Sequence, residues 1–205
     1  MEDVLDLYAE PHDPLKPTIC FDECPYQMIS ETRTPIPAQP GHVQRYDYEY
    51  KREGTCNLFM FAEPQQGWRQ VTVTDRRTTL DFAQCMKDLV DVYYPHADII
   101  RVVLDNLNTH TPAALYEAFE PTEARRIVRK LEFHYTPKHG SWLNMAEVEF
   151  AVLSTQCLDR RLGNVQVVQN EIAAWECQRN AAHSVINWRF TVQVARVKLE
   201  RLYPS

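Results

Sequence analysis

Glycine is scarce in this chain, with five residues against 13 prolines in a length of 205. No stretch reads Gly-x-Gly-x-x-Gly or Gly-x-x-x-x-Gly-Lys-Ser/Thr, the loops whose backbone amides hold phosphates. No apolar run approaches the roughly 20 residues that span a bilayer. The first 14 residues contain five acids and no Lys or Arg, unlike a secretory signal. We therefore expect no glycine-rich nucleotide loop, no membrane partner and no signal-directed export.

Paired cysteine motifs are also absent, because the six Cys residues are scattered and none forms Cys-x-x-Cys. Disulfide frameworks are typical of short secreted chains, so we expect reduced thiols and a cytoplasmic location. A zinc site is an alternative, since Cys20 and Cys24, with His134 and His139, match Cys₂His₂ spacing by count. The two pairs lie far apart in the sequence, and Cys20 falls in an apolar run that favours a buried small hydrophobe. Zinc is therefore the weaker interpretation.

Charge is unevenly distributed along the chain. The net charge is −6, but residues 1–100 carry 9 basic and 17 acidic side chains, whereas residues 101–205 carry 13 and 11. A nucleic acid can therefore still contact the second half locally, although the average charge argues against it. We interpret five basic residues as candidate weak contacts to a phosphate backbone, with a solvated helix face as the alternative for the first four. They are Arg125, Arg126, Arg129, Lys130 and Lys138.

The order of apolar segments predicts one mixed α/β domain over residues 18–205, after an acidic, Pro-rich lead-in over residues 1–17. With 44% hydrophobic residues the chain can build a real core. The first three strands are expected to be antiparallel, and the later ones parallel and flanked by helices. Strands are predicted at 18–23, 56–62, 68–74, 99–104 and 131–135, and helices at 79–94, 112–119, 122–130, 144–161, 165–182 and 191–202.

Three acids stand out by position. Asp22 ends the first apolar run, Asp105 directly follows Val102-Val103-Leu104, and Glu147 lies near the start of a predicted helix. Carboxylates at strand ends are costly to bury unless compensated, and hard divalent cations prefer oxygen ligands. Two such ions can activate a water or hydroxyl and stabilise the leaving oxygen of a phosphodiester. Each acid taken alone is better explained as a capping or solvated turn residue.

The motifs around these acids resemble a known family. Asp105-Asn106-Leu107-Asn108-Thr109-His110 and Thr136-Pro137-Lys138-His139-Gly140-Ser141-Trp142-Leu143-Asn144-Met145-Ala146-Glu147 are similar to the catalytic motifs of DDE-superfamily transposases, in the bacterial insertion-sequence branch related to mariner elements. The first Asp of that family corresponds to Asp22 in Cys-Phe-Asp-Glu. The resemblance covers the chain from about residue 17 to its end and implies a ribonuclease-H-like fold.

The resemblance further implies a function. It is metal-dependent hydrolysis of DNA phosphodiesters followed by strand transfer during transposition. Asp22, Asp105 and Glu147 would bind two Mg²⁺ or Mn²⁺ ions, with Asn106, His110 and Asn144 in support. The implied partners are DNA, as element ends and target, and further copies of the chain. The implied location is the nucleoid of a bacterial cytoplasm. The alternatives are a stand-alone ribonuclease-H-like nuclease and an inactive remnant that only binds DNA or a partner.

Several features depart from the family pattern or leave a choice open. Asp105 and Glu147 have 41 residues between them, more than is typical of mariner elements, and Glu149 is the competing third ligand. We expect Glu147, because two residues further along a helix the side chain points nearly to the opposite face. Relatives carry a helix-turn-helix DNA-binding region before the catalytic domain, whereas this sequence begins just before the first predicted catalytic strand. We therefore expect weak, salt-sensitive DNA binding here. Trp142 is either a stacking platform for an unpaired base or a packing residue.

Overall fold

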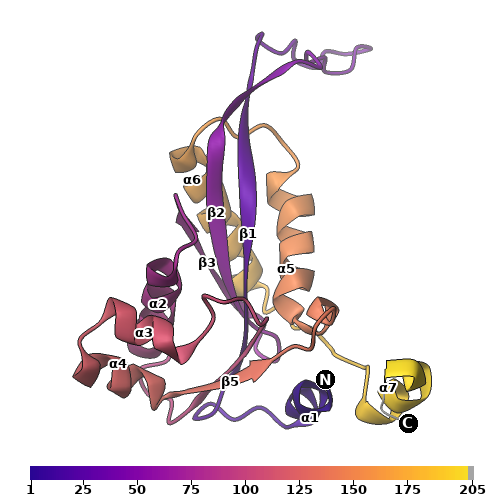
Figure 1. Cartoon of the computed structure of the whole chain (residues 1–205). Coiled ribbons are helices and arrows are strands. Elements are labelled where there is room, and N and C mark those ends of the chain that lie inside the picture. The colour runs from indigo at the N-terminus through magenta and orange to yellow at the C-terminus, as the bar shows by residue number, and fades with distance from the viewer. Residues whose placement is uncertain (203–205) are drawn as a thin grey trace.

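The computed structural model describes residues 1–202 and contains one five-stranded sheet in the order β3-β2-β1-β4-β5 (Figure 1). β1 pairs antiparallel with β2, and β2 with β3, whereas β1–β4 and β4–β5 are parallel. The predicted α/β class with a mixed sheet is therefore confirmed. The strands are β1 (Thr18–Glu31), β2 (Tyr50–Glu63), β3 (Trp68–Thr74), β4 (Ile100–Leu104) and β5 (Leu131–Tyr135).

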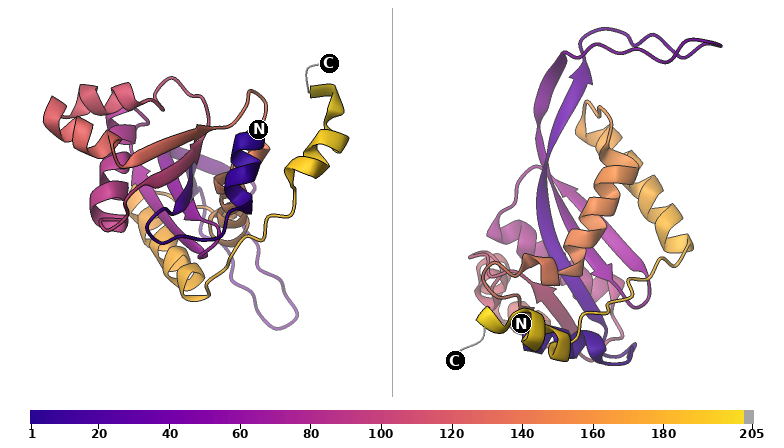
Figure 2. Two further views of the ribbon diagram at one scale, coloured as in Figure 1. Left: turned by 90° about the horizontal axis from the view of Figure 1, so that it is seen from below. Right: turned by 90° about the vertical axis from the view of Figure 1, so that its right-hand side faces the viewer.

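Helices cover both faces of the sheet (Figure 2). Side chains alternate along β2, so Phe59 and Phe61 join the core under one set of helices, while Leu58 and Met60 face the other side. The first face carries α2 (Thr79–Asp88) with its continuation Leu89–Tyr93, α3 (Pro112–Ala118) and α4 (Pro121–Val128). The second carries α5 (Met145–Leu153) with its continuation Ser154–Leu158, and α6 (Val165–Ala181).

The two terminal helices share a smaller core with the parallel part of the sheet. α1 (Glu2–Ala9) buries Val4, Leu5 and Leu7, and α7 (Val192–Lys198) packs into the same cluster; a last turn spans Glu200–Leu202. The stretch predicted as a lead-in therefore includes a helix that packs on the domain. No helix within residues 1–202 is long and apolar enough to cross a membrane.

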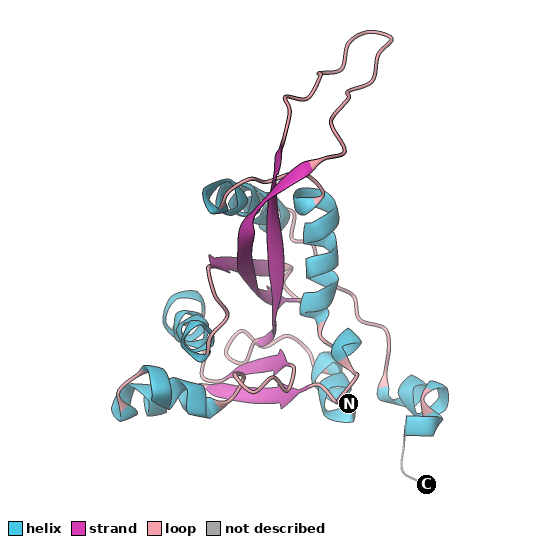
Figure 3. Ribbon diagram, turned by 45° about the horizontal axis from the view of Figure 1, so that its top comes forward, coloured by secondary structure: helices cyan, strands magenta, loops and turns pink. Residues whose placement is uncertain are grey.

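β1 and β2 are much longer than predicted, and their connection over residues 32–49 projects from the domain (Figure 3). The prediction ended β1 at residue 23, shortly before Pro25. The strand continues because it pairs with β2 as far as Glu31↔Tyr50, with an irregularity between Gln27 and Ile29. Pro25 is tolerated because β4 pairs with β1 only at Thr18–Cys20, so β1 has a free side beyond that point.

Candidate active site

Asp22 and Asp105 lie at the same level of the sheet. The β1–β4 register pairs Cys20 with Val103, and extending it by two residues places Asp22 opposite Asp105. The prediction placed Asp22 at a strand end. In the structure it lies inside β1, where that strand extends past the end of β4. Cys20 and Val103 pack in the core with Leu143, just before α5. Because side chains two apart on a strand share a face, Asp22 is directed to the side of the sheet where α5 begins, whereas Asp105 lies just after the end of β4.

The start of α5 adds a third carboxylate. Asn144 is the N-cap of the helix and accepts a hydrogen bond from the Ala146 amide at 3.2 Å. Its Nδ2 donates to the Phe21 carbonyl at 2.8 Å and lies 3.5 Å from Asp22 Oδ2. Glu147 is exposed in the first turn, where a negative charge is favourable. Asn144 thus attaches the helix start to β1 beside Asp22.

The electrostatics of Asp22 show that the three acids act on one another. The pKa of Asp22 is raised to about 7, chiefly by burial and further by the negative charges of Glu23, Glu147 and Asp105. The Glu23 amide, which donates to Asp22 Oδ1 at 2.8 Å, opposes it. Within residues 1–202, no Lys or Arg forms an ion pair with any of the three acids. The groups that do contact them include the Glu23 amide at Asp22, and the Leu107 amide and His110 at Asp105.

Asp105 is oriented by a buried histidine. Its Oδ1 accepts from the Leu107 amide at 3.0 Å and lies 2.6 Å from His110 Nδ1. His110 is 1% exposed, against the rings of Phe21 and Phe82, and its Nε2 lies 3.0 Å from Glu23 Oε2 in an ion-pair contact without hydrogen-bond geometry. Burial lowers the pKa of His110, but the carboxylates of Glu23 and Asp105 outweigh it and raise the pKa above its ordinary value.

The loops after β4 and β5 are braced against each other. Asn106 Nδ2 donates to the Thr136 carbonyl at 2.8 Å, and the Tyr135 hydroxyl donates to the His110 carbonyl at 2.8 Å. The loop that carries Asp105 is thereby attached to the segment that leads into α5. Glu23 is a charged neighbour of these residues that was not singled out from the sequence; its place directly after Asp22 was the available signal.

The predicted basic residues fall into two groups. Four belong to α4 and its end, on the face of the sheet opposite α5, and Lys138 is exposed in the loop after β5. Arg126 forms ion pairs with Asp91 at 2.7 Å and Glu123 at 2.8 Å, so its charge is already neutralised. Lys130 donates to the Pro95 carbonyl at 3.0 Å, while Arg125 and Arg129 are exposed.

Trp142 packs against the C-terminal segment rather than the sheet. Its ring is stacked with Trp188 at 6.4 Å between centroids and meets Phe190 edge-on at 5.4 Å. The side chain nevertheless remains 42% exposed, close in sequence to Glu147. One face of the indole is therefore used for packing and the remainder is open to solvent.

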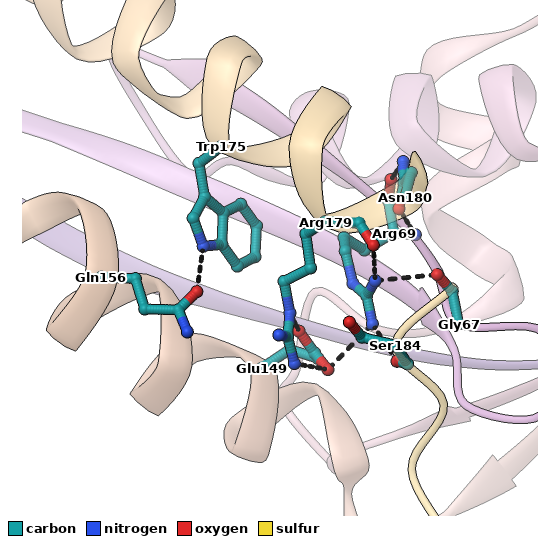
Figure 4. Close-up of polar contacts among 8 residues, drawn as sticks. All are labelled: Gly67, Arg69, Glu149, Gln156, Trp175, Arg179, Asn180 and Ser184. Atoms are coloured by element: carbon teal, nitrogen blue, oxygen red, sulfur yellow. Dashed lines mark hydrogen bonds and ion pairs between the residues drawn. The ribbon is translucent and has the colours of Figure 1, made fainter. Parts of the chain in front are cut away.

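Glu149, the competing third acid, is separated from this cluster. It is fully buried, with its carboxylate held by Arg69 and Arg179 (Figure 4). Neither arginine was predicted as a partner of Glu149 from the sequence. The signal for Arg69 was its position in β3, because alternation places it on the same face as Val71 and Val73, where an arginine needs a buried partner.

The donor chemistry of Asp22, Asp105 and Glu147 fits a hard divalent cation, which would relieve the repulsion that raises the pKa of Asp22. Within residues 1–202, however, no group of three or more His, Cys, Asp or Glu side chains is positioned to hold a metal ion. The carboxylates must therefore draw closer to share one. The zinc alternative is not formed either, since Cys20 Sγ lies 3.2 Å from the Tyr8 hydroxyl and His134 pairs with Asp3 at 2.9 Å.

Comparison with known proteins places this geometry in a family. The profile of the DDE superfamily endonucleases matches residues 17–169. Among solved structures, the chain is similar to the crystal structure of the Mos1 mariner paired end complex with Mn, with a TM-score of 0.59 and 14% identity, covering 88% of this chain and 54% of that one. The chain thus spans about half the length of that protein and shares its ribonuclease-H-like fold. No curated protein matches the sequence.

Proposed function

Because the chain belongs to the DDE superfamily endonucleases, we propose that it is the catalytic domain of a transposase that cuts DNA phosphodiesters and transfers the strand ends. The observation that carries this proposal is the gathering of Asp22, Asp105 and Glu147 where β1 extends past β4 and α5 begins. Asp22 belongs to the sheet, and the glutamate is attached to the same strand through Asn144. Asp105 directly follows β4, and its loop is braced against the loop after β5. Sites on such elements hold their geometry better than sites on free loops.

Asp22, Asp105 and Glu147 would hold two Mg²⁺ or Mn²⁺ ions. When bound, such ions supply an activated water or 3′-hydroxyl and stabilise the leaving oxygen of the phosphodiester. The negative charges around Asp22 favour a bound cation and disfavour a bare phosphate. Divalent cations are therefore expected to increase the affinity of this face for DNA.

The neighbouring side chains orient the carboxylates. His110, buried between Glu23 and Asp105, contacts one oxygen of Asp105 and leaves the other free. Outer partners of this kind set the direction and basicity of metal ligands. Asn106 holds the Asp105 loop against the loop after β5. Asn144 holds α5 at a constant distance from β1, so that Glu147 stays beside Asp22.

The proposed partners are DNA, as element ends and target, and further copies of the chain, within a bacterial nucleoid. Lys138 and Trp142, exposed beside the segment that carries Glu147, are better placed for weak contacts to DNA at the site than the arginines of α4. Their contribution would be a phosphate contact and partial stacking on an unpaired base.

Nicking of a supercoiled plasmid tests the proposal. With Mg²⁺ or Mn²⁺ the protein is expected to nick, and Asp105→Asn to abolish nicking while leaving the fold intact. Glu117→Gln, an exposed acid on α3, is the matched control and should nick normally. Undiminished cleavage by Asp105→Asn would refute the mechanism. Nicking without joining of a 3′-hydroxyl end to target DNA would indicate a stand-alone nuclease. DNA binding without any nicking would indicate an inactive remnant.

A further inference from the structure

Three buried or half-buried charged residues form a cluster behind α5, here called the Arg69–Glu149–Arg179 triad (Figure 4). Arg69 Nη2 donates to Glu149 Oε1 at 3.0 Å. Arg179 approaches the same carboxylate with two nitrogens, Nε to Oε2 at 2.8 Å and Nη2 to Oε1 at 3.0 Å. The side chains of Arg69 and Glu149 are 1% and 0% exposed. Bidentate pairing of this kind restricts direction as well as distance.

Arg69 connects the triad to three other parts of the chain. Its guanidinium donates to the carbonyls of Gly67 at 2.8 Å and Ser184 at 2.7 Å. The side chain of Asn180 binds the backbone of Arg69 twice. The Arg69 N–H donates to Asn180 Oδ1 at 2.9 Å, and Asn180 Nδ2 donates to the Arg69 carbonyl at 2.8 Å. Glu149 is therefore held by a support that includes β3, the end of α6 and the segment after it.

The triad acts on the helix that carries the proposed third metal ligand. Glu147 and Glu149 are two residues apart on α5, which separates their side chains by roughly 200° around the helix axis. Anchoring Glu149 on the inner side thus fixes the rotation of α5 and with it the direction of Glu147. α5 is nine residues long, and its other polar anchor is Asn144 at the N-cap.

We propose that the Arg69–Glu149–Arg179 triad is a positioning device, which sets the rotation of α5 so that Glu147 faces Asp22; this inference rests on the proposed function of that site. A purely stabilising role explains the triad less well. Buried ion pairs contribute little net stability compared with well-packed apolar side chains, so charges here need another reason. That reason is the fixed direction of the bidentate contact to Glu149, which lies two residues from Glu147 on the same helix.

The test compares Glu149→Gln with Glu176→Gln. Glu176, on α6, accepts the Val71 amide at 2.8 Å and lies close enough to Arg69 for their charges to interact, so its substitution perturbs the β3–α6 contact and the surroundings of Arg69 but removes no contact to Glu149. Two readouts are measured on the folded, purified chain: Mn²⁺ affinity by calorimetric titration, and amide hydrogen exchange of the first turn of α5 in metal-free buffer. Arg179→Lys, which removes the bidentate contact and keeps the charge, is the second variant should Glu149→Gln fail to fold.

Glu149→Gln is expected to weaken Mn²⁺ binding by about 10- to 100-fold, the usual effect of removing a group that orients a metal ligand. It should also accelerate exchange in the first turn of α5, whereas Glu176→Gln should change neither readout. Unchanged Mn²⁺ affinity and unchanged α5 exchange in Glu149→Gln, or equal effects of both variants, would overturn the inference. If the unsubstituted chain binds no Mn²⁺, the metal role in the proposed function fails. The positioning role is then decided by hydrogen exchange alone: faster exchange in α5 for Glu149→Gln but not for Glu176→Gln supports it, and equal exchange in both variants refutes it.

Discussion

Replacing Asp22 by Asn should stabilise the metal-free protein at neutral and alkaline pH. The substitution keeps the size of the side chain and an oxygen that accepts the Glu23 amide, and it removes the charge. In the folded protein the pKa of Asp22 is raised from 3.8 to about 7, first by burial and then by Glu23, Glu147 and Asp105. Asn has no charge to desolvate, so this cost disappears.

The sign and size follow from linkage. A carboxyl with a raised pKa binds its proton more tightly when folded, so its contribution favours folding below pH 4 and is lost as pH rises through 7. The difference between 3.8 and about 7 corresponds to roughly 4 kcal/mol at pH 8, an upper bound because Asp22 is not completely buried. Asp22→Asn is therefore expected to raise the free energy of unfolding by about 2–4 kcal/mol at pH 8 and by almost nothing at pH 4.

Urea unfolding in EDTA at pH 4, 6 and 8 measures this difference. The exposed substitution Glu117→Gln serves as control and should change the free energy of unfolding equally at all three pH values. Equal stability of Asp22→Asn and the unsubstituted protein at pH 8, or a loss of stability, would refute the argument that burial and the neighbouring carboxylates destabilise the charged form of Asp22.

Three further predictions concern the framework of the site. Asn144→Ala removes the hydrogen bonds to the Ala146 amide and the Phe21 carbonyl, and should lower the free energy of unfolding by about 2 kcal/mol in chemical denaturation. A change under about 0.5 kcal/mol would show that neither bond stabilises the fold. Arg69→Met leaves Glu149 with a single partner and should lower the free energy of unfolding by about 3–5 kcal/mol, whereas a neutral effect in thermal melts would contradict the buried pairing. Replacing residues 34–45 by a two-residue turn should change the free energy of unfolding by no more than about 0.5 kcal/mol, because this exposed loop holds only isolated bridges. A large loss of stability would contradict the view that the loop does not pack on the domain.

The sheet class could be predicted because its signals are local. Apolar runs ending in Asp105 and Tyr135 indicate parallel strands, and the turn between β2 and β3 indicates an antiparallel pair. Helical periodicity also predicted that Glu147 and Glu149 lie on opposite faces, and the structure places one exposed and the other fully buried. These features depend on neighbours within one or two turns of the chain.

The remaining features depend on contacts between distant segments. β1 continues past Pro25 because β2 pairs with it, which no local signal indicates. Arg126 is neutralised by Asp91, 35 residues earlier. Arg69 meets Glu149 across 80 residues. Pro25 and Arg69 fit their local segments poorly and Arg126 fits a solvated helix face, but in each case only the fold shows the partner.

The most direct test of the account is a crystal of the protein soaked with Mn²⁺ and examined by anomalous scattering. Anomalous peaks are expected among the carboxylates of Asp22, Asp105 and Glu147, with oxygen ligands at roughly the 2.0–2.6 Å typical of hard divalent cations. Glu149 should remain bound to its arginines. A peak on Glu149, or Mn²⁺ bound only elsewhere while Glu147 points away from Asp22, would contradict the proposed active site.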